Sequence, residues 1–190
     1  MILDFDKSKD EAWRDIKHEI HRGALDKKHP FRFLVLSTSS ENGPESRWVV
    51  LRKVSDQLNM YVYTDSRTQK VQDLKSHRWA HVLLYHEKKA LQIRCKGKVE
   101  LHFQNEISEA HWNRVQGLAK RAYTPTIAPG RHIQSPEKAH DWKPEMGSQH
   151  FAVIEFIPEE FDVLQLNRSE HLRLKITKDK GVWAMSWVAP

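Results

Sequence analysis

The feature that most constrains the fold is a run of short apolar segments, separated by turn residues, between Phe31 and Phe103. The segments are rich in branched and aromatic side chains, which is typical of β-strands. We predict strands at 31–38, 47–54, 58–64, 79–85 and 90–103. Turns are predicted at 41–44 and near Asp56. The alternation in the last segment is interrupted at Gly97, which predicts a β-bulge there.

Helices are predicted at only a few places. Ser8 can cap a helix that stops at Gly23, with Trp13, Ile16 and Ile20 on its buried face. A short helix is expected over 70–77 and a longer one over 105–120. The apolar stripe of the longer helix is predicted to consist of Ile107, Ala110, Val115 and Leu118.

The last third of the chain begins with a proline-rich segment, 123–147, that predicts a long loop. Loops of this length are commonly either mobile or part of a binding site, and whether this one forms a lid is left open. Strands are then expected at 150–157, 161–166, 171–178 and 182–188, the last two joined by a turn at 179–181. Because most of the roughly nine strands are linked by hairpins, we predict a mainly β fold, an antiparallel barrel or sandwich with a few helices. No linker or repeat stands out, so a single domain, 1–190, is expected.

Composition and charge narrow the class of protein. The chain has 190 residues and 39% hydrophobic residues, which is enough for one substantial core. No apolar run approaches the roughly 20 residues of a membrane helix, and the first residues are acidic rather than basic, so we expect a soluble cytoplasmic protein that does not bind membranes. The single cysteine, Cys95, suits a reducing compartment and a place in the core. The net charge of +6 favours anionic partners, but the basic residues are scattered, and we therefore expect a small anion rather than nucleic acid.

Anion-binding groups gather where the third strand meets the short helix, in the segment Thr64 to Lys70. Hydroxyl and carboxylate side chains are ordinary helix caps, which is the simpler explanation. A helix N-terminus with hydroxyls before it and a lysine after it is also suited to a phosphate group, because free backbone N–H groups and the helix dipole favour negative charge. The segment alone leaves both explanations open.

The order of motifs around this corner resembles a known family. The chain reads SRWVVLR, then YVYT, then QK, then LQI followed by Gly97, and it ends in HLRLKI and VWAMSWVAP. This order is similar to the pyridoxamine 5′-phosphate oxidase family, whose members are FMN-binding split β-barrels. The resemblance covers most of the chain from Phe31 to Pro190 and is poor in the proline-rich segment. It implies an antiparallel split β-barrel, FMN as cofactor, and a homodimer with FMN at the interface.

The resemblance also implies roles for individual residues. Arg47 and Lys70 would hold the FMN phosphate at the corner, while Tyr63 and Thr64 would lie along the cofactor. The remaining residues that match cofactor-binding positions are Trp48, Val49, Val50, Gln69, Gln92 and Arg173. The positions that match substrate contacts are Arg52, Arg121 and His171. Strand alternation supports two separate sites, because Arg47 and Arg52 differ by an odd number and therefore face opposite sides of one strand.

The chain departs from the family pattern at its substrate contacts. Gln69 stands where the family has an arginine, and Ser169-Glu170-His171 replaces Arg-Leu-His, with Arg168 as a possible substitute. Arg121 followed by Pro129-Gly130 resembles a divergent branch of the family. Flavin binding is thus better supported than oxidation of a vitamin B6 phosphate.

We therefore expect an FMN-dependent oxidase, similar to pyridoxamine 5′-phosphate oxidase, that acts on a small anionic substrate. The alternatives are an FMN-binding protein without that activity, and a flavin reductase-like protein. A metal site is not expected, because His18 and His21 lack the spacing of a zinc-protease helix. The catalytic residues, the substrate and the electron acceptor are not predicted.

Overall fold

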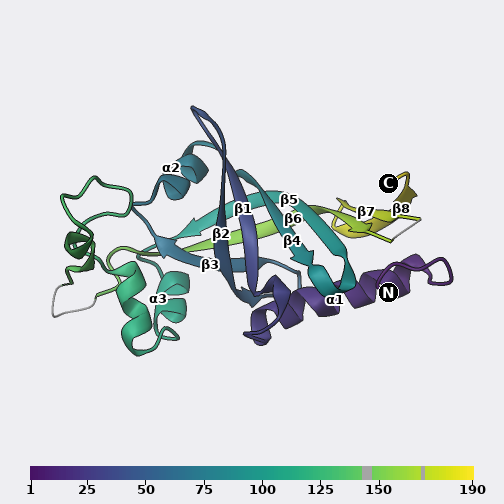
Figure 1. Ribbon diagram of the computed structural model, residues 1–190, viewed down its shortest axis with the longest axis horizontal. Coiled ribbons are helices and arrows are strands. Elements are labelled where there is room, and N and C mark those ends of the chain that lie inside the picture. The colour runs from purple at the N-terminus through teal and green to yellow at the C-terminus, as the bar shows by residue number, and fades with distance from the viewer. Residues whose placement is uncertain (143–146, 168–169) are drawn as a thin grey trace.

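The computed structural model describes residues 1–142, 147–167 and 170–190. Three α-helices and eight strands form its regular structure (Figure 1). The helices are α1 (Lys9–Leu25), α2 (Gln69–Ser76) and α3 (Glu106–Trp112). The strands are β1 (Phe33–Ser40), β2 (Gly43–Val54), β3 (Met60–Asp65), β4 (Trp79–His86), β5 (Leu91–His102), β6 (Phe151–Gln165), β7 (Leu172–Asp179) and β8 (Val182–Val188). Short 3-10 helices occur at Pro30–Arg32, Glu87–Lys89, Gly117–Tyr123 and Pro136–His140.

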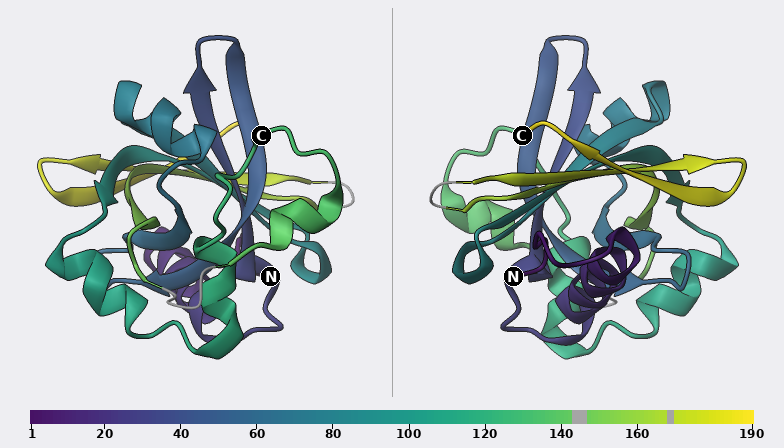
Figure 2. Two further views of the ribbon diagram at one scale, coloured as in Figure 1. Left: turned by 90° about the vertical axis from the view of Figure 1, so that its left-hand side faces the viewer. Right: turned by 90° about the vertical axis from the view of Figure 1, so that its right-hand side faces the viewer.

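All strand pairs are antiparallel, and six strands close into a barrel. The sheet order is β3-β2-β1-β4-β5-β6-β7-β8, and an additional pairing of β3 with β6 closes the first six strands on themselves. The β7–β8 hairpin extends the sheet beyond the barrel to one side (Figure 2). The prediction of a mainly β, antiparallel split barrel with few helices is confirmed.

Strands β5 and β6 form the longest pairing and contain the predicted bulge. Their register shifts between Lys96 and Gly97, so that Gly97 pairs with Pro158 and Glu159 is the extra residue. A side chain at Gly97 would come within 2.2 Å of the Ile157 carbonyl oxygen, which explains the glycine. The two strands predicted at 150–157 and 161–166 are a single strand, β6. The prediction of two strands was wrong because the polar interruption between them lies at the bulge and does not end the pairing.

Helix α1 packs its predicted face onto the barrel. Ser8 and Glu11 form a reciprocal capping box at its start, and Trp13, Ile16 and Ile20 are buried. Gly23 does not stop the helix, which continues to Leu25. The glycine is instead required by packing, because a Cβ atom there would lie 2.7 Å from Phe31 Cβ.

The helix predicted over 105–120 is shorter than expected. Asn105 caps α3 with a capping box, but the helix ends at Trp112 and a 3-10 helix follows from Gly117. The predicted apolar stripe was wrong except at Val115, which is buried, since Ala110 is exposed, Ile107 is 42% exposed and Leu118 is 70% exposed. The buried face of α3 consists instead of Ser108, His111 and Trp112. Helix α3 and the 117–140 segment lie at the end of the molecule opposite β7 and β8 (Figure 1).

The proline-rich segment is only partly described, because 143–146 lie outside the described residues. Its described part folds back on itself, with the Thr126 amide donating to the Asp141 carbonyl at 3.0 Å. Among the described residues, no helix is long and apolar enough to cross a membrane.

Candidate functional site

The corner between β3 and α2 brings three predicted residues together. Thr64 points into the barrel end, because it lies two residues after the buried Val62 and therefore shares its face of β3. The Nζ of Lys70, in the first turn of α2, donates to the Thr64 hydroxyl at 3.2 Å. Thr68, the N-cap residue of α2, lies 3.4 Å from the Thr64 hydroxyl through its own Oγ1. The corner therefore presents an ammonium and two hydroxyls side by side.

Arg47 reaches the same corner from β2. Its Nη1 donates to the Thr38 hydroxyl at 2.7 Å, and Thr38 in turn donates to the buried Asp73 carboxylate at 2.9 Å. Asp73 also accepts from the Gln69 amide at 2.9 Å, and Arg47 Nη2 lies 3.9 Å from it. Asp73 thus holds strand β1, strand β2 and helix α2 in one fixed arrangement.

Burial makes Lys70 unusual for a lysine. Its pKa is lowered from the ordinary value, first by burial and then by the positive charge of Arg47, while Asp65 and Asp73 act in the opposite direction. A phosphate placed beside Lys70 and Arg47 would favour their charged forms. The donor set therefore suits a phosphorylated cofactor such as FMN.

The neighbours of Arg47 on β2 divide between the two faces of the strand. Val49 packs against the core, and Trp48 is 67% exposed on the outer face. Val50 lies on that outer side as well and pairs with Phe33 of β1. Gln69 uses its amide to bind Asp73. Arg47 and Arg52 contact different groups, Thr38 and Tyr123, and the register of β2 with β3 shifts between Leu51 and Lys53.

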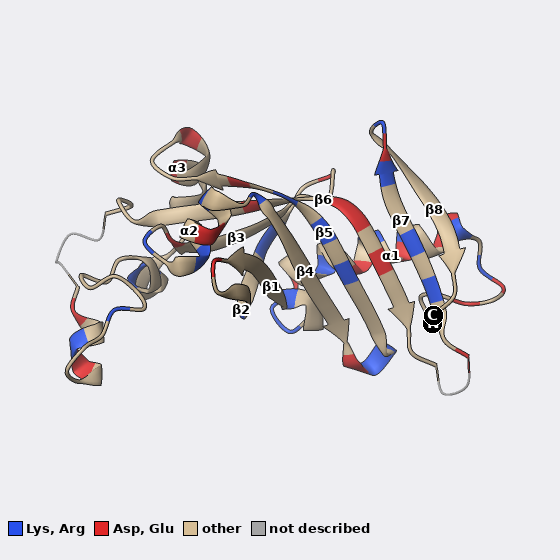
Figure 3. Cartoon of the chain, turned by 90° about the horizontal axis from the view of Figure 1, so that it is seen from above, with Lys and Arg blue, Asp and Glu red and all other residues tan. Residues whose placement is uncertain are grey.

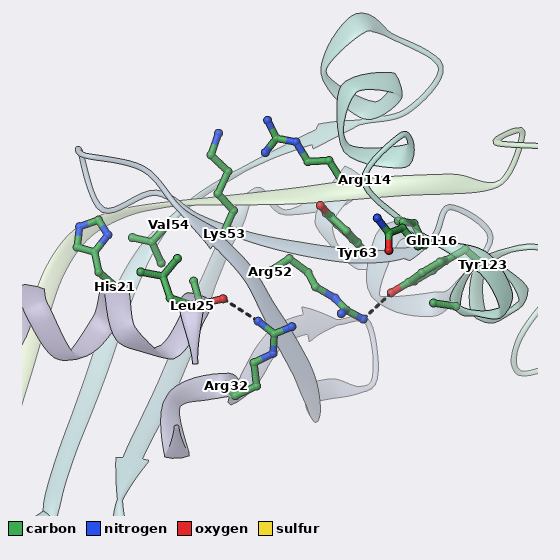
Figure 4. A pocket seen from close by; sticks show the side chains of 13 residues that line it. His21, Leu25, Arg32, Arg52, Lys53, Val54, Tyr63, Arg114, Gln116 and Tyr123 are labelled. Atoms are coloured by element: carbon green, nitrogen blue, oxygen red, sulfur yellow. Dashed lines mark hydrogen bonds between the residues drawn. The ribbon is translucent and has the colours of Figure 1, made fainter. Parts of the chain in front are cut away.

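Arg52 and Tyr63 lie in a cavity of about 450 Å³ between the barrel, the end of α1 and the 3-10 helix at Gly117–Tyr123 (Figure 4). Arg52 Nη2 donates to the Tyr123 hydroxyl at 3.0 Å, and its guanidinium carbon lies 5.5 Å from the centre of the Tyr63 ring. The structure does not bring Tyr63 to the phosphate corner, because Tyr63 and Thr64 point to opposite faces of β3. The cavity is thus a second site, separate from the corner.

Tyr63, which lines the cavity, shares a hydrogen bond with a histidine that lies behind it. Tyr63 Oη and His111 Nδ1 are 2.8 Å apart. The pKa of His111 is lowered to about 4, mainly by burial and then by Lys53 and Arg114, so its imidazole is neutral near pH 7. Burial raises the pKa of Tyr63, which keeps the phenol protonated. The pair is neutral over the physiological range.

A buried polar network supports His111 from behind. The Tyr61 ring stacks on His111 at 5.2 Å, and its hydroxyl donates to Glu155 at 2.7 Å. Glu155 also binds His102 at 2.8 Å. The pKa of Tyr61 is raised to about 12 by burial and then by Glu155. These contacts fix the position of His111 beneath the cavity.

Gln92 and Arg173 lie on the outer face of the sheet, away from the corner. Gln92 alternates with the buried Ile93, and the cross-strand row runs from Gln92 through Leu164 to Arg173. Arg173 binds Asp162 through two hydrogen bonds, 2.8 and 2.7 Å. Charged residues lie side by side on β5, β6 and β7 in this region (Figure 3). Within one chain the structure therefore does not bring these two residues to Arg47 and Lys70.

The other predicted substrate residues lie outside the cavity. Arg121 stacks on Trp142 with its guanidinium 4.9 Å from the ring centre, and Trp142 donates to the Arg121 carbonyl. His171 lines a hollow beside the C-terminus together with Arg173 and Trp187. Arg168, the possible substitute for the family arginine, lies outside the described residues.

Two groups of potential metal ligands occur among the described residues, Glu19-His29-His86 and Glu100-His102-Glu155. In the first group, His29 and His86 accept backbone N–H groups at Nδ1, so their Nε2 atoms carry the protons and face Glu19. Lys89 Nζ also forms an ion pair with Glu19 Oε1 at 2.7 Å. The geometry is that of a buried hydrogen-bond network that ties α1 to the β4–β5 turn.

Sequence reasoning missed Thr38 and Asp73 at the corner, and Arg32, Arg114 and Tyr123 at the cavity. The contact of Asp73 with Gln69 could have been predicted, because the two residues are four apart and so share one face of a helix. The cavity residues carried none, since they come from segments far apart in the sequence and meet only through the closed barrel.

The closed six-stranded barrel has the split-barrel fold of a solved FMN-binding protein. Residues 10–103 match the family described as pyridoxamine 5′-phosphate oxidase, FMN-binding domain. This part of the chain, which contains Arg47, Thr64 and Lys70, belongs to that family, as the sequence predicted.

Solved structures extend the likeness to most of the chain. A pyridoxamine 5′-phosphate oxidase-related, FMN-binding protein from Nostoc punctiforme has a TM-score of 0.79 at 20% identity, covering 94% of this chain and 97% of its own. PhzG from Burkholderia lata, solved with tetrahydrophenazine-1-carboxylic acid, has a TM-score of 0.72 at 18% identity, with coverage of 94% and 92%. General Stress Protein 26 from Bacillus anthracis has a TM-score of 0.51 at 19% identity, with coverage of 83% and 98%. At these identities the likeness shows the fold alone. No curated protein matches the chain.

Proposed function

We propose that this protein is an FMN-dependent oxidoreductase of the oxidase type, built as a single domain, that acts on a small anionic substrate. The observation that carries the proposal is the convergence of Arg47, Thr64 and Lys70 at one corner of a family FMN-binding domain. Bound FMN would supply the redox chemistry of the reaction. The protein would hold the cofactor, orient the substrate and exclude water.

At the corner, Lys70 and Arg47 would hold the FMN phosphate, with Thr64 as a neutral hydrogen-bond partner. Among the described residues, Lys70 Nζ makes one hydrogen bond, to Thr64, so it has donors left for a phosphate. Gln69 adds no charge, and Asp73 keeps Arg47 in place. Along β2, Trp48, Val49 and Val50 would carry the backbone against which the cofactor lies.

The outer face of the barrel supports a homodimer. Phe33 and Trp48 are 53% and 67% exposed on adjacent strands, and Tyr85 of β4 is 44% exposed. Exposed aromatic side chains that cluster on one face are typical of subunit interfaces. In a dimer built on this face, Gln92 and Arg173 of one subunit would be free to approach a cofactor held by the other, which would account for their distance from the corner within one chain.

A binding protein that holds FMN without a dedicated substrate is the second candidate. It is favoured by the replacement of the family substrate segment by Ser169-Glu170-His171 and by the position of Arg121, which stacks on Trp142 outside the cavity. The same replacements make pyridoxamine 5′-phosphate itself a poor expectation as substrate. A flavin reductase-like activity is a further variant of this candidate.

The experiment starts from the absorption spectrum of the purified protein. We expect a yellow protein, or apoprotein that takes up FMN but not riboflavin with comparable affinity. Anaerobic mixing with a panel of small anionic amines and alcohols should then bleach the flavin, and oxygen should restore it with release of hydrogen peroxide. Bleaching by NADH or NADPH alone would support the reductase-like candidate, and no bleaching across the panel would support the binding protein. A protein that takes up no FMN would refute the proposal.

A further inference from the structure

The cavity that contains Arg52 is lined by cations and by no acid among the described residues. Arg32, Arg52, Lys53 and Arg114 all line it, together with the imidazole of His21. None of these four cations forms an ion pair within the part of the chain that the structure describes. By contrast, Arg22, Arg47, Arg67, Arg94 and Arg173 all lie within 4.0 Å of a carboxylate. Like charges gathered without a counter-charge favour binding of an anion.

The cations form two groups at different sides of the cavity. Arg32 and Arg52 are close enough that Arg52, after burial, contributes to lowering the pKa of Arg32. Lys53 and Arg114 both contribute to lowering the pKa of His111, and both lie on the side of the cavity away from Arg32 (Figure 4). Tyr63 lies between the groups (Figure 4), and Arg114, Arg52 and Arg32 all lower its pKa against the effect of burial.

One of the two groups is held rigidly before any ligand binds. Arg32 Nη1 donates to the Ala24 carbonyl at 2.8 Å, which fixes its guanidinium at the end of α1. Arg52 Nη2 donates to the Tyr123 hydroxyl, while its Nε is buried without a hydrogen-bond partner among the described residues. Guanidinium groups held in this way lose little conformational entropy when they bind a carboxylate or phosphate.

The space between the two groups is apolar and has room for a small ring. The side chains of Leu25, Val54 and Val115 line it, as do the rings of Tyr63 and Tyr123. A volume of about 450 Å³ lies within the range of small-ligand sites.

We propose that this cavity binds a small molecule with two separated acidic groups, one held by Arg32 and Arg52 and the other by Lys53 and Arg114. This inference rests on the proposed function, because it names the substrate class of the proposed enzyme. It assigns binding roles to Arg32, Arg114 and Lys53, which lie outside the motifs that the sequence resemblance covers. The body of the ligand is a ring or a short hydrocarbon chain that packs between the two tyrosines.

The test uses FMN-free protein and three probes, benzoate, isophthalate and terephthalate, titrated by calorimetry at constant ionic strength in a buffer without phosphate or sulfate. Because a second charge-assisted contact forms only when a second acidic group is present, at least one dicarboxylate should bind about tenfold or more tightly than benzoate. Equal affinity for all three probes, or no binding of any, would overturn the proposal.

Substitutions then assign the two ends. Arg114→Gln should reduce the advantage of the dicarboxylate to within about threefold of benzoate, and Arg32→Gln should do the same from the other end. Arg78→Gln is the matched control, because Arg78 is an exposed arginine just before β4 and does not line the cavity. Loss of the advantage in the control as well would mean a general charge effect, and would contradict the assignment. Circular dichroism verifies that each variant is folded. If Arg32→Gln does not fold, Arg114→Gln still tests the proposal, because Arg114 is exposed and its substitution should be tolerated.

FMN titration of the same variants separates this inference from the cofactor proposal. Arg114→Gln should bind FMN as the unsubstituted protein does, because Arg114 is not part of the phosphate corner. Dicarboxylate binding without FMN binding would leave the cavity proposal standing and remove the flavoenzyme. FMN binding without any dicarboxylate preference would remove the cavity proposal and leave the cofactor proposal standing.

Discussion

The phosphate corner and the cation-lined cavity are both built from arginine, lysine and hydroxyl groups, yet they balance their charges differently. At the corner, Arg47 and Lys70 lie beside Asp73, Asp65 and Glu45. In the cavity, Arg32, Arg52 and Arg114 have no carboxylate partner within the described residues. The corner is thus part of the folded scaffold as well as a binding site, whereas the cavity retains uncompensated positive charge.

This difference predicts opposite responses to substitution. Removing a charged group from the corner breaks contacts that hold β1, β2 and α2 together. Removing a charged group from the cavity relieves repulsion in the absence of a ligand. The comparison is therefore testable on the apoprotein, without knowledge of the substrate.

The largest effect is expected for Asp73→Ala. The substitution leaves the Thr38 hydroxyl, the Gln69 amide and the Arg47 guanidinium without their shared acceptor in a buried site. Loss of one partner from such a network costs about 3–5 kcal/mol in the free energy of unfolding. Urea denaturation measures it, with Glu45→Ala as control, because Glu45 is exposed and should change stability by less than about 0.5 kcal/mol. Similar losses in the two variants would contradict the structural role of Asp73.

The free energy of unfolding should depend on pH through His111, which lies behind the cavity. Its pKa is about 4 in the folded protein and about 6.5 in the unfolded chain, so the unfolded state binds the proton first on acidification. Stability is therefore lost as the pH falls from about 6.5 to about 4, by up to about 3 kcal/mol, and this contribution is constant above and below that window. Many carboxylates also titrate at low pH. The quantity to compare is therefore the loss of stability on acidification in the unsubstituted protein and in His111→Gln. The variant should lose less stability between pH 7 and pH 4, and parallel curves would refute the assignment.

Lys70→Met tests the corner as a phosphate site. The substitution keeps the length of the side chain and removes its charge, so it should weaken FMN binding about a hundredfold through loss of a charge-assisted hydrogen bond. Riboflavin, which has no phosphate, should bind the variant and the unsubstituted protein alike. Quenching of flavin fluorescence gives both affinities. An equal loss of affinity for FMN and riboflavin would mean that Lys70 does not bind the phosphate.

The sequence predicted the elements whose signals are local. The face of α1 and the bulge at Gly97 follow from periodicity or from a single residue type. The failures have non-local causes. Gly23 lies inside α1 because Phe31 packs on it, and β6 is one strand because a bulge absorbs its polar interruption.

The candidate site shows the same division. The part of the corner between β3 and the start of α2 lies in one short segment of the sequence, and that segment predicted it. The cavity takes Arg32 from before β1, Arg52 from β2 and Arg114 from beyond α3, and only barrel closure brings them together. The unexpected burial of His111 also depends on tertiary contacts, because α3 ends one residue after it and turns its polar face toward Tyr61 and Tyr63.

The smallest expected effect is also the most direct test of the uncompensated charge. Arg114→Gln should raise the stability of the apoprotein by a few tenths of a kcal/mol at low ionic strength, because it removes one of several like charges around an exposed rim. The gain should disappear in about 0.5 M sodium chloride, where exposed charges are screened over a few ångströms. Arg78→Gln, made at an exposed arginine away from the cavity, corrects for the change in net charge. If Arg114→Gln is less stable than this control at low salt, Arg114 has a structural partner and the cavity is balanced in the same way as the corner.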